Sequence, residues 1–243
     1  MRLIFVRHGE PDYTIDSLTE KGWKEAELLS HRMEKIKAKK CFVSPLGRAK
    51  DTASLSLRKM NTEWEELDFI REFSPTINRP DNKKEKKVAW DWLPEDWTSY
   101  EDFYTTDKWT NHPIFEEAGV GAEVEYIYSG FEKLLISLGY RKEGKLFKAE
   151  KPNNDTYVFF CHFGITCVLL GYLLNISPMC LWHSTCAAPT SLTIVNTEER
   201  RKGVASFRMA AFGDTSHLYA GDEPVSFAAR FCECFGNNDE RHD

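Results

Sequence analysis

The first sixty residues alternate between short apolar runs and amphipathic helical patterns. Residues 3–6 and 41–43 are apolar runs of β-forming side chains, so they predict two buried strands. Between them, apolar residues recur at helical spacing over residues 23–36, with Thr19 as the expected N-cap. The Ser-Pro pair at residues 44–45 predicts a second helix that has Ser as its cap and Pro at its first position. This strand, helix, strand, helix order favours a parallel sheet, and therefore a three-layer α/β fold with a mostly parallel central sheet and helices on both faces.

The second half of the chain continues this rhythm. A helical period over residues 124–138 precedes a polar stretch, and residues 157–161 then form a strongly apolar predicted strand. A helix that ends near Asn175 follows this strand. Residues 191–196 and 204–212 predict two strands with a short connection, which implies an antiparallel hairpin at one edge of the sheet.

An aromatic and charged segment, residues 74–121, interrupts the pattern. It contains a charged run at residues 81–87, of which residues 83–87 are expected to be a solvated loop, and several tryptophans and tyrosines among acids and prolines. We expect this segment to be an inserted cap of loops and short helices within a single domain that spans residues 1–243. Residues 139–155 are predicted to be a polar loop.

Composition excludes several classes of protein. The chain of 243 residues has a net charge of −6 and 42% hydrophobic residues, which argues against disorder and against general nucleic-acid binding. No apolar run approaches the ~20 residues that cross a bilayer, and the N-terminus does not resemble a secretory signal. The seven cysteines have no metal-ligand spacing, so we expect reduced thiols in a cytoplasmic protein. None of them is followed by an arginine six positions later, as cysteine-based phosphatases require.

Positively charged and imidazole side chains follow three of the predicted strands. Arg7 and His8 end the first strand, Arg48 comes shortly after the second, and His162 follows the strand at residues 157–161. Ligands of open α/β sheets bind outside the carboxyl ends of the strands. Two guanidinium groups meeting there predict a site for a phosphate or another oxyanion.

Three motifs in this order resemble the histidine phosphatase superfamily, which has the phosphoglycerate-mutase-like fold. They are V-R-H-G-E at residues 6–10, S-P-L-x-R-A-x-x-T-A at residues 44–53 and H-x-G at residues 162–164, supported by L-T-x-x-G at residues 18–22. The resemblance covers the sheet core and leaves the aromatic insert unmatched. The segment at residues 73–77 lacks the tyrosine and glycine residues of glycolytic mutases, which favours the phosphatase branch.

The resemblance implies a role for each motif residue. His8 would be the nucleophile that accepts the phosphoryl group, with its second ring nitrogen held by a hydrogen bond. Arg7, Arg48 and a cationic His162 would neutralise the phosphoryl oxygens. Gly9 would let the backbone pass close to the phosphate.

The leaving group needs a proton from a general acid, which in this superfamily often follows the next strand. We expect it to be Glu72, which follows a predicted strand at residues 67–70, with Asp81 as the alternative. Two further positions depart from the family pattern. Thr14 stands where an asparagine often contacts phosphate, and Phe163 replaces a glycine after the second histidine. Both are predicted to contact the substrate, Phe163 through its backbone N–H.

The sequence therefore predicts a phosphoric monoester hydrolase that works without metal or cofactor, through a phosphohistidine, on a small phosphorylated metabolite. Two alternatives remain open. The first is a phosphoryl mutase of the phosphoglycerate type, which would share the first chemical step. The second is a non-catalytic module that binds a phosphorylated ligand and has no competent acid.

Overall fold

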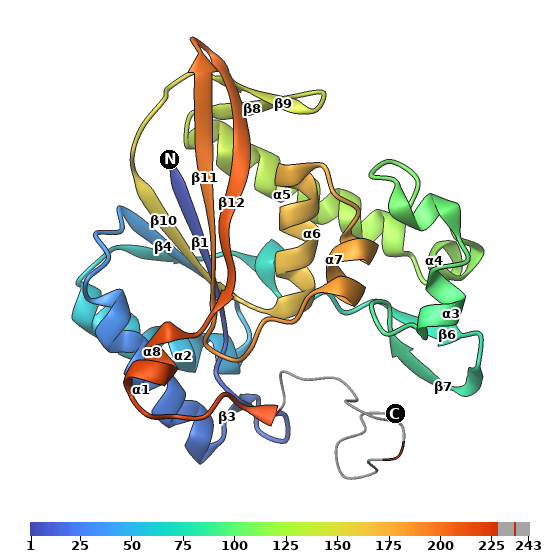
Figure 1. Cartoon of the computed structure of the whole chain (residues 1–243), viewed down its shortest axis with the longest axis horizontal. Helices are drawn as coiled ribbons and strands as arrows, with labels where there is room; N and C mark the ends of the chain where they lie inside the picture. Colours follow the sequence, from blue (N-terminus) through green and yellow to red (C-terminus); the bar gives the residue numbers. More distant parts are fainter. Residues whose placement is uncertain (228–235, 237–243) are drawn as a thin grey trace.

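An eight-stranded mixed sheet forms the centre of the molecule in the computed structural model, which describes residues 1–227 and Gly236 (Figure 1). In spatial order its strands are β5 (Trp64–Glu66), β4 (Lys40–Val43), β10 (Thr156–Cys161), β1 (Arg2–Arg7), β11 (Leu192–Arg201), β12 (Val204–Asp214), β9 (Leu146–Ala149) and β8 (Tyr140–Glu143). The α/β class expected from the sequence is confirmed.

Only half of this sheet is parallel. β5, β4, β10 and β1 run parallel, whereas every pairing from β1–β11 onward is antiparallel. The expected β11–β12 hairpin is present, but it does not lie at the edge, because β9 and β8 extend the sheet beyond it. The polar loop expected over residues 139–155 is instead the β8–β9 hairpin. Its turn contains Gly144 at φ +60°, and Tyr140 and Phe147 are buried on alternating positions.

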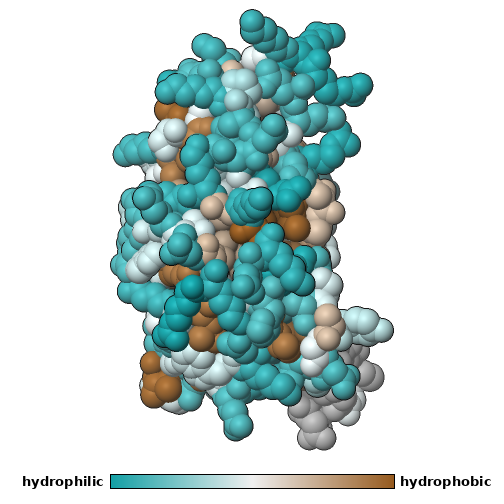
Figure 2. All heavy atoms as spheres, turned by 90° about the vertical axis from the view of Figure 1, so that its left-hand side faces the viewer, coloured by the Kyte–Doolittle hydropathy of each residue, from teal (hydrophilic) through white to brown (hydrophobic). Residues whose placement is uncertain are grey.

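Helices cover both faces of the sheet, as expected (Figure 1). The main helices are α1 (Glu20–Met33), α2 (Gly47–Met60), α5 (Val120–Ser137) and α6 (Phe163–Leu174). Alternation along β1 sets the two layers. Leu3 and Phe5 belong to the core cluster shared with α5 and α6, and Ile4 and Val6 to the cluster shared with α1 and α2. The face seen from the left of Figure 1 is largely hydrophilic, with scattered apolar patches (Figure 2).

Two predictions about secondary structure were wrong: the start of the second helix and the strand at residues 67–70. Thr19 caps α1 as expected, since its hydroxyl accepts a hydrogen bond from the backbone N–H of Gly22 at 3.0 Å. However, α2 begins at Gly47 and not at the Ser-Pro pair, because Asp16 binds the Gly47 N–H and the hydroxyl of Ser44 turns elsewhere. The strand expected at residues 67–70 is a 3₁₀ turn, η1 (Asp68–Ile70), which begins where the β4–β5 ladder ends.

Residues 74–121 form small elements beside the main sheet. They are β6 (Thr76–Arg79), β7 (Asn82–Val88), α3 (Pro94–Trp97), η2 (Glu101–Tyr104) and α4 (Pro113–Glu117). The charged run expected to be a loop lies mostly in β7, which pairs with β6. Trp92, Trp97 and Trp109 are buried in the same core cluster as α5 and α6, so these three side chains contribute packing.

The remaining elements are β2 (Pro11–Asp12), β3 (Ser17–Leu18), α7 (Pro178–Ser184) and α8 (Ser216–Ala220). In the described part of the chain, no helix combines the length and the apolar character that crossing a membrane would require.

Candidate active site

The carboxyl ends of β4, β10 and β1 meet at one edge of the sheet. The register pairs Arg7 with Cys161 and Phe160 with Val43, so the three strands end at the same level. The residues that follow them therefore lie together, and the rings of His8 and His162 are 5.0 Å apart between centroids. The convergence predicted from the three motifs is present in the structure.

His8 is buried and held in one orientation. Its Nδ1 lies 2.7 Å from the carbonyl oxygen of Gly9. Because a carbonyl can only accept, Nδ1 carries the proton in the neutral ring, and Nε2 keeps its lone pair. Burial, together with the charges of Arg7 and Arg48, lowers the pKa of His8 well below its usual value, against the opposing effect of the Gly9 bond. His8 is therefore a neutral imidazole at physiological pH.

His162 is also fully buried, and its Nε2 lies 2.8 Å from the hydroxyl of Ser44. Burial lowers the pKa of His162 well below its usual value, and His8, Arg48 and Arg7 act in the same direction. Without a bound oxyanion the ring of His162 is therefore neutral, chiefly because it is buried. A phosphate dianion at the site would favour its protonated form.

Arg48 lies in the first turn of α2, and the carboxylate of Asp16 fixes the orientation of its side chain. Its Nη1 lies 2.6 Å from Oδ1 of Asp16, whose Oδ2 accepts the backbone N–H of Gly47 at 2.7 Å. Asp16 has a left-handed backbone at φ +48°. A Cβ on Gly47 would lie 2.1 Å from the carbonyl oxygen of Asp16, so only glycine fits there. The guanidinium group also lies 5.4 Å from the ring centre of Tyr13.

Arg7 reaches the site from the end of β1. Its Nη1 donates to the carbonyl oxygen of Ala187 at 2.6 Å, and its guanidinium carbon lies 6.0 Å from the ring centre of Phe163. In the described part of the chain, the buried Nε atoms of Arg7 and Arg48 have no hydrogen-bond partner. Both guanidinium groups thus keep unused donors.

Glu72 lies beside the start of α6. Its Oε1 accepts the backbone N–H of Phe73 at 2.8 Å and that of Ile165 at 3.0 Å. Burial raises the pKa of Glu72 above its ordinary value, although both N–H groups and the charges of Arg7 and Arg48 oppose it. The carboxyl group therefore lies within the electrostatic reach of both arginines.

The alternative acid and one predicted contact have other partners. Asp81, in the β6–β7 hairpin, accepts from Nε of Arg79 at 2.6 Å. Thr14 is exposed, and its N–H and hydroxyl both donate to Oδ1 of Asp12. The structure therefore brings Glu72 to the arginines and leaves the hydroxyl of Thr14 engaged with its own loop.

Close packing against α1 requires a glycine at position 9, and the sequence did not predict this contact. A Cβ at Gly9 would lie 2.8 Å from the carbonyl oxygen of Gly22, the glycine of the L-T-x-x-G pattern. The N–H of Gly9 donates to the hydroxyl of Thr52 at 2.9 Å, and this hydroxyl donates to the carbonyl oxygen of Arg48 at 2.8 Å. These contacts tie the loop after β1 to α1 and α2.

Three supporting residues were not predicted from the sequence to act at the site: Asp16, Ser44 and Thr52. Ser44 and Thr52 are part of the second motif, so their positions near the site were a usable signal. Asp16 carries no such signal, because its role depends on a left-handed backbone and on the approach of α2.

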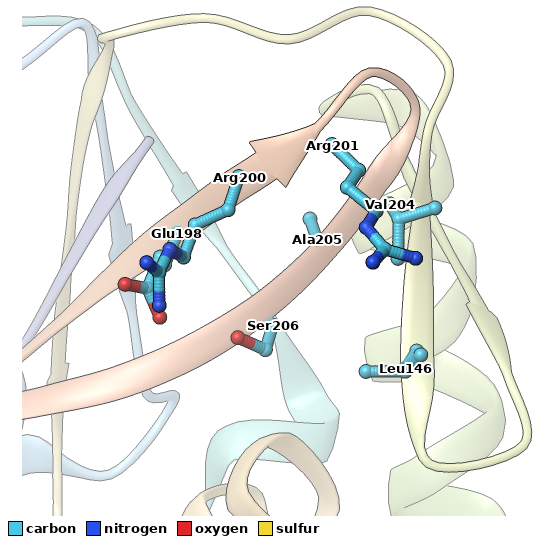
Figure 3. Close-up of a pocket in the computed structure, with 7 residues that line it drawn as sticks. All are labelled: Leu146, Glu198, Arg200, Arg201, Val204, Ala205 and Ser206. Atoms are coloured by element: carbon cyan, nitrogen blue, oxygen red, sulfur yellow. The ribbon is translucent and has the colours of Figure 1, made fainter.

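Other possible sites lie away from this edge. A cavity of about 450 Å³ is lined by Arg200, Arg201 and Val204 near the tip of the β11–β12 hairpin (Figure 3). Since Leu192 pairs with Val6, this tip is at the opposite end of the sheet from His8. Within residues 1–227 and at Gly236, no three His, Cys, Asp or Glu side chains are grouped so that they could hold a metal ion.

Residues 3–110 match the family model of the histidine phosphatase superfamily (branch 1). No curated protein sequence matches the chain. Among solved structures, glucosyl-3-phosphoglycerate phosphatase of a mycobacterium is similar with a TM-score of 0.57 and 17% identity, covering 87% of this chain and 98% of that one.

Two further structures are similar in the same way. Phosphoserine phosphatase of Entamoeba histolytica has a TM-score of 0.57 and 19% identity, over 89% of this chain and 98% of the other. The α-ribazole phosphatase of Shigella flexneri has a TM-score of 0.52 and 17% identity, over 88% and 97%. At such identities the likeness lies in the fold. The family match over residues 3–110 and the shared fold agree with the resemblance that the three motifs indicate.

Proposed function

We propose that the protein hydrolyses phosphomonoesters in two steps, with a phosphoryl group carried transiently by His8. The observation that supports this most directly is the hydrogen bond between Nδ1 of His8 and the carbonyl oxygen of Gly9. It leaves the lone pair of Nε2 available beside Arg7 and Arg48, whose charges also hold the ring neutral. A neutral imidazole next to a bound phosphate is a competent nucleophile.

In the first step, Nε2 of His8 attacks phosphorus, and the bond from phosphorus to the ester oxygen breaks. Arg7 and Arg48 neutralise the transferred oxygens, which is the main requirement of phosphoryl transfer. Glu72 donates its proton to the leaving oxygen. The proton belongs on Oε2, because Oε1 already accepts two backbone N–H groups.

In the second step, the Glu72 carboxylate takes a proton from water. The resulting hydroxide attacks phosphorus, the bond between phosphorus and Nε2 breaks, and inorganic phosphate leaves. Glu72 ends the cycle protonated and His8 ends it neutral, so the two steps balance. No metal is assigned, because the positive charge comes from the two arginines and, once phosphate is bound, from His162.

We further propose that the substrate is a small phosphorylated metabolite. The similar structures are phosphatases whose names specify glucosyl-3-phosphoglycerate, phosphoserine and α-ribazole compounds. In this chain, which we treat as one domain, residues 74–121 would cap the site and select the leaving group. The contact between Trp90 and Phe163, 6.1 Å between ring centres, supports this assignment of the cap. Buried thiols such as Cys41 and Cys161 suit the reducing cytoplasm.

The test is phosphate release from a panel of phosphorylated metabolites and from p-nitrophenyl phosphate. We expect hydrolysis by the unaltered protein and a loss of at least about a thousandfold in His8→Ala. Inclusion of a phosphoglycerate separates hydrolysis from mutase activity, because a mutase would return an isomer without releasing phosphate. Equal rates for the unaltered protein and His8→Ala would exclude this nucleophile.

A further inference from the structure

Residues of α1 and α8 line a second hollow. These two helices are in contact on one side of the sheet (Figure 1). The volume of the hollow is about 370 Å³, and its polar lining comes from His31 and Arg32 on α1, from Lys35 just after α1, and from Ser216 and His217 on α8. The two helices approach closely there: a Cβ on Gly221 would lie 2.5 Å from the side chain of Leu28. The hollow is therefore built on packed helices, and most of its polar lining consists of basic side chains.

Two buried nitrogen atoms of this lining lack partners in the part of the chain that the structure describes. They are Nη1 of Arg32 and Nδ1 of His217. The other ends of both groups are fixed. Nη2 of Arg32 lies 2.6 Å from Oδ2 of Asp214, and Nε2 of His217 lies 3.0 Å from the hydroxyl oxygen of Thr190. His217 is 7% exposed, and an unpaired buried polar atom costs about 1–3 kcal/mol, so a ligand that pairs with both atoms is favoured.

The surrounding hydrogen bonds determine whether each of the two unpaired nitrogen atoms donates or accepts. The hydroxyl of Thr190 donates to the carbonyl oxygen of Pro189 at 2.7 Å, so its oxygen can only accept from Nε2 of His217. Burial and the charge of Arg32 lower the pKa of His217 to about 4, against the opposing charge of Asp214, and the ring is neutral. Nδ1 therefore carries a lone pair and accepts, whereas Nη1 of Arg32 donates.

We propose that this hollow is a second oxyanion site that binds hydrogen phosphate. The O–H of the ion donates to Nδ1 of His217, and a charged oxygen accepts from Nη1 of Arg32. The basic lining favours an anion over water. A hydrogen phosphate ion carries both an O–H and a negative oxygen, whereas sulfate at neutral pH has no O–H to give.

The site is linked to the nucleophile through one residue. Thr190, which holds His217 through its hydroxyl, also donates its backbone N–H to the carbonyl oxygen of His8 at 3.1 Å. If the proposed function holds, inorganic phosphate is the product of the reaction. The hollow then binds the product at a site that Thr190 connects to His8. This last role rests on the proposed function, while the binding of phosphate does not.

The experiment is a titration of the full chain with inorganic phosphate at neutral pH, followed through the side-chain nitrogen signals of the histidines by NMR. We expect a saturable shift of the Nδ1 signal of His217. Sulfate should bind at this signal at least about tenfold more weakly, since one hydrogen bond to a charged ligand is lost. Arg32→Gln should abolish the shift, and His31→Gln, on the same rim, should change the affinity by less than about twofold.

The outcomes separate the two proposals. If phosphate shifts only the signals of His8 and His162, the second site is wrong and the proposed function is unaffected. If phosphate shifts only the signal of His217, the second site holds and phosphate binding at His8 is in doubt. Equal affinity for sulfate and phosphate in the unaltered protein would overturn the assignment without depending on any variant.

Discussion

The Asp16 carboxylate joins the guanidinium group of Arg48 to the first N–H of the helix that carries it. One oxygen lies 2.6 Å from Nη1 of Arg48, and the other lies 2.7 Å from the backbone nitrogen of Gly47. The same residue thus caps α2 and aims its arginine. Since Arg48 is the first-turn residue that would bind phosphate, its position depends on a loop residue outside the three motifs.

Asp16→Asn should therefore weaken catalysis without removing the nucleophile. The amide keeps a hydrogen bond to Gly47 or Arg48 but loses the charge, so we expect kcat/KM to fall by about tenfold, roughly 1.4 kcal/mol, mostly through KM. Steady-state kinetics with p-nitrophenyl phosphate measure this. Asp51→Asn is the control, because Asp51 is one turn along α2 and pairs with the hydroxyl of Ser17 instead of an arginine. Equal losses in the two variants would mean that the effect is not specific to Arg48.

Glu72→Gln tests the general acid through the leaving group. The variant cannot donate a proton, so alkyl phosphates should lose about 10²–10⁴ in kcat, whereas p-nitrophenyl phosphate, with a good leaving group, should lose far less at the first step. The raised pKa of Glu72 keeps its protonated form present above the usual range, and activity on alkyl phosphates should fall as pH rises through that pKa. This alkaline limb should vanish in the variant. The same slowing for both kinds of substrate would count against the role, and Asp81→Asn should leave both unchanged.

The two buried histidines should not titrate near neutrality. Burial and the neighbouring arginines depress the pKa of His8 and of His162, so both stay neutral well below pH 6.5 in the absence of an oxyanion. We expect their ring signals in NMR spectra to be constant from about pH 6 to pH 8. Saturating vanadate or phosphate should then raise the pKa of His162. A titration of His8 near pH 6.5 would contradict the buried, arginine-flanked arrangement.

Glu25 should make stability depend on pH. Its side chain is fully buried on α1, its Oε2 accepts the backbone N–H of Glu10 at 2.9 Å, and burial raises its pKa from 4.5 to about 7. A raised pKa means that the stabilising protonated form is fully present below pH 4.5 and lost as pH rises through about 7. Glu25→Gln should match the unaltered protein near pH 5 and exceed it at pH 8, by up to roughly 3 kcal/mol.

Denaturant unfolding at the two pH values measures this difference. Glu27→Gln is the matched control on the same helix, because the side chain of Glu27 is half exposed and pairs with Lys59 at 2.7 Å. It should show no gain at pH 8. A loss of stability in Glu25→Gln at pH 8 would mean that Lys21, 3.8 Å away, stabilises the charged carboxylate.

The parts of this molecule that the sequence predicted are those that local pattern determines. β1, β4, β10 and α6 follow from continuous apolar runs, and the parallel order of these strands brings His8, Arg48 and His162 to one edge. Thr19 was identifiable as a cap because a capping hydroxyl acts within one helical turn.

The errors arose where the structure depends on contacts distant in the chain. The β8–β9 hairpin was predicted as a loop because its strands are short and charged, and only packing of Tyr140 and Phe147 against the core reveals them. The start of α2 was misplaced because Asp16, far from it in the sequence, binds the Gly47 N–H. The lowered pKa of His162 in the phosphate-free protein was not predicted, because motifs do not reveal burial or the proximity of two guanidinium groups.

The most direct test of the mechanism is capture of the phosphorylated protein. The protein is mixed with a phosphorylated substrate, quenched within one turnover in alkali, which preserves phosphohistidine, and digested for mass spectrometry. The account predicts one phosphoryl group on His8, acid-labile and absent from His8→Ala. Rapid phosphate release with no label on His8, or a label on another residue, would contradict it.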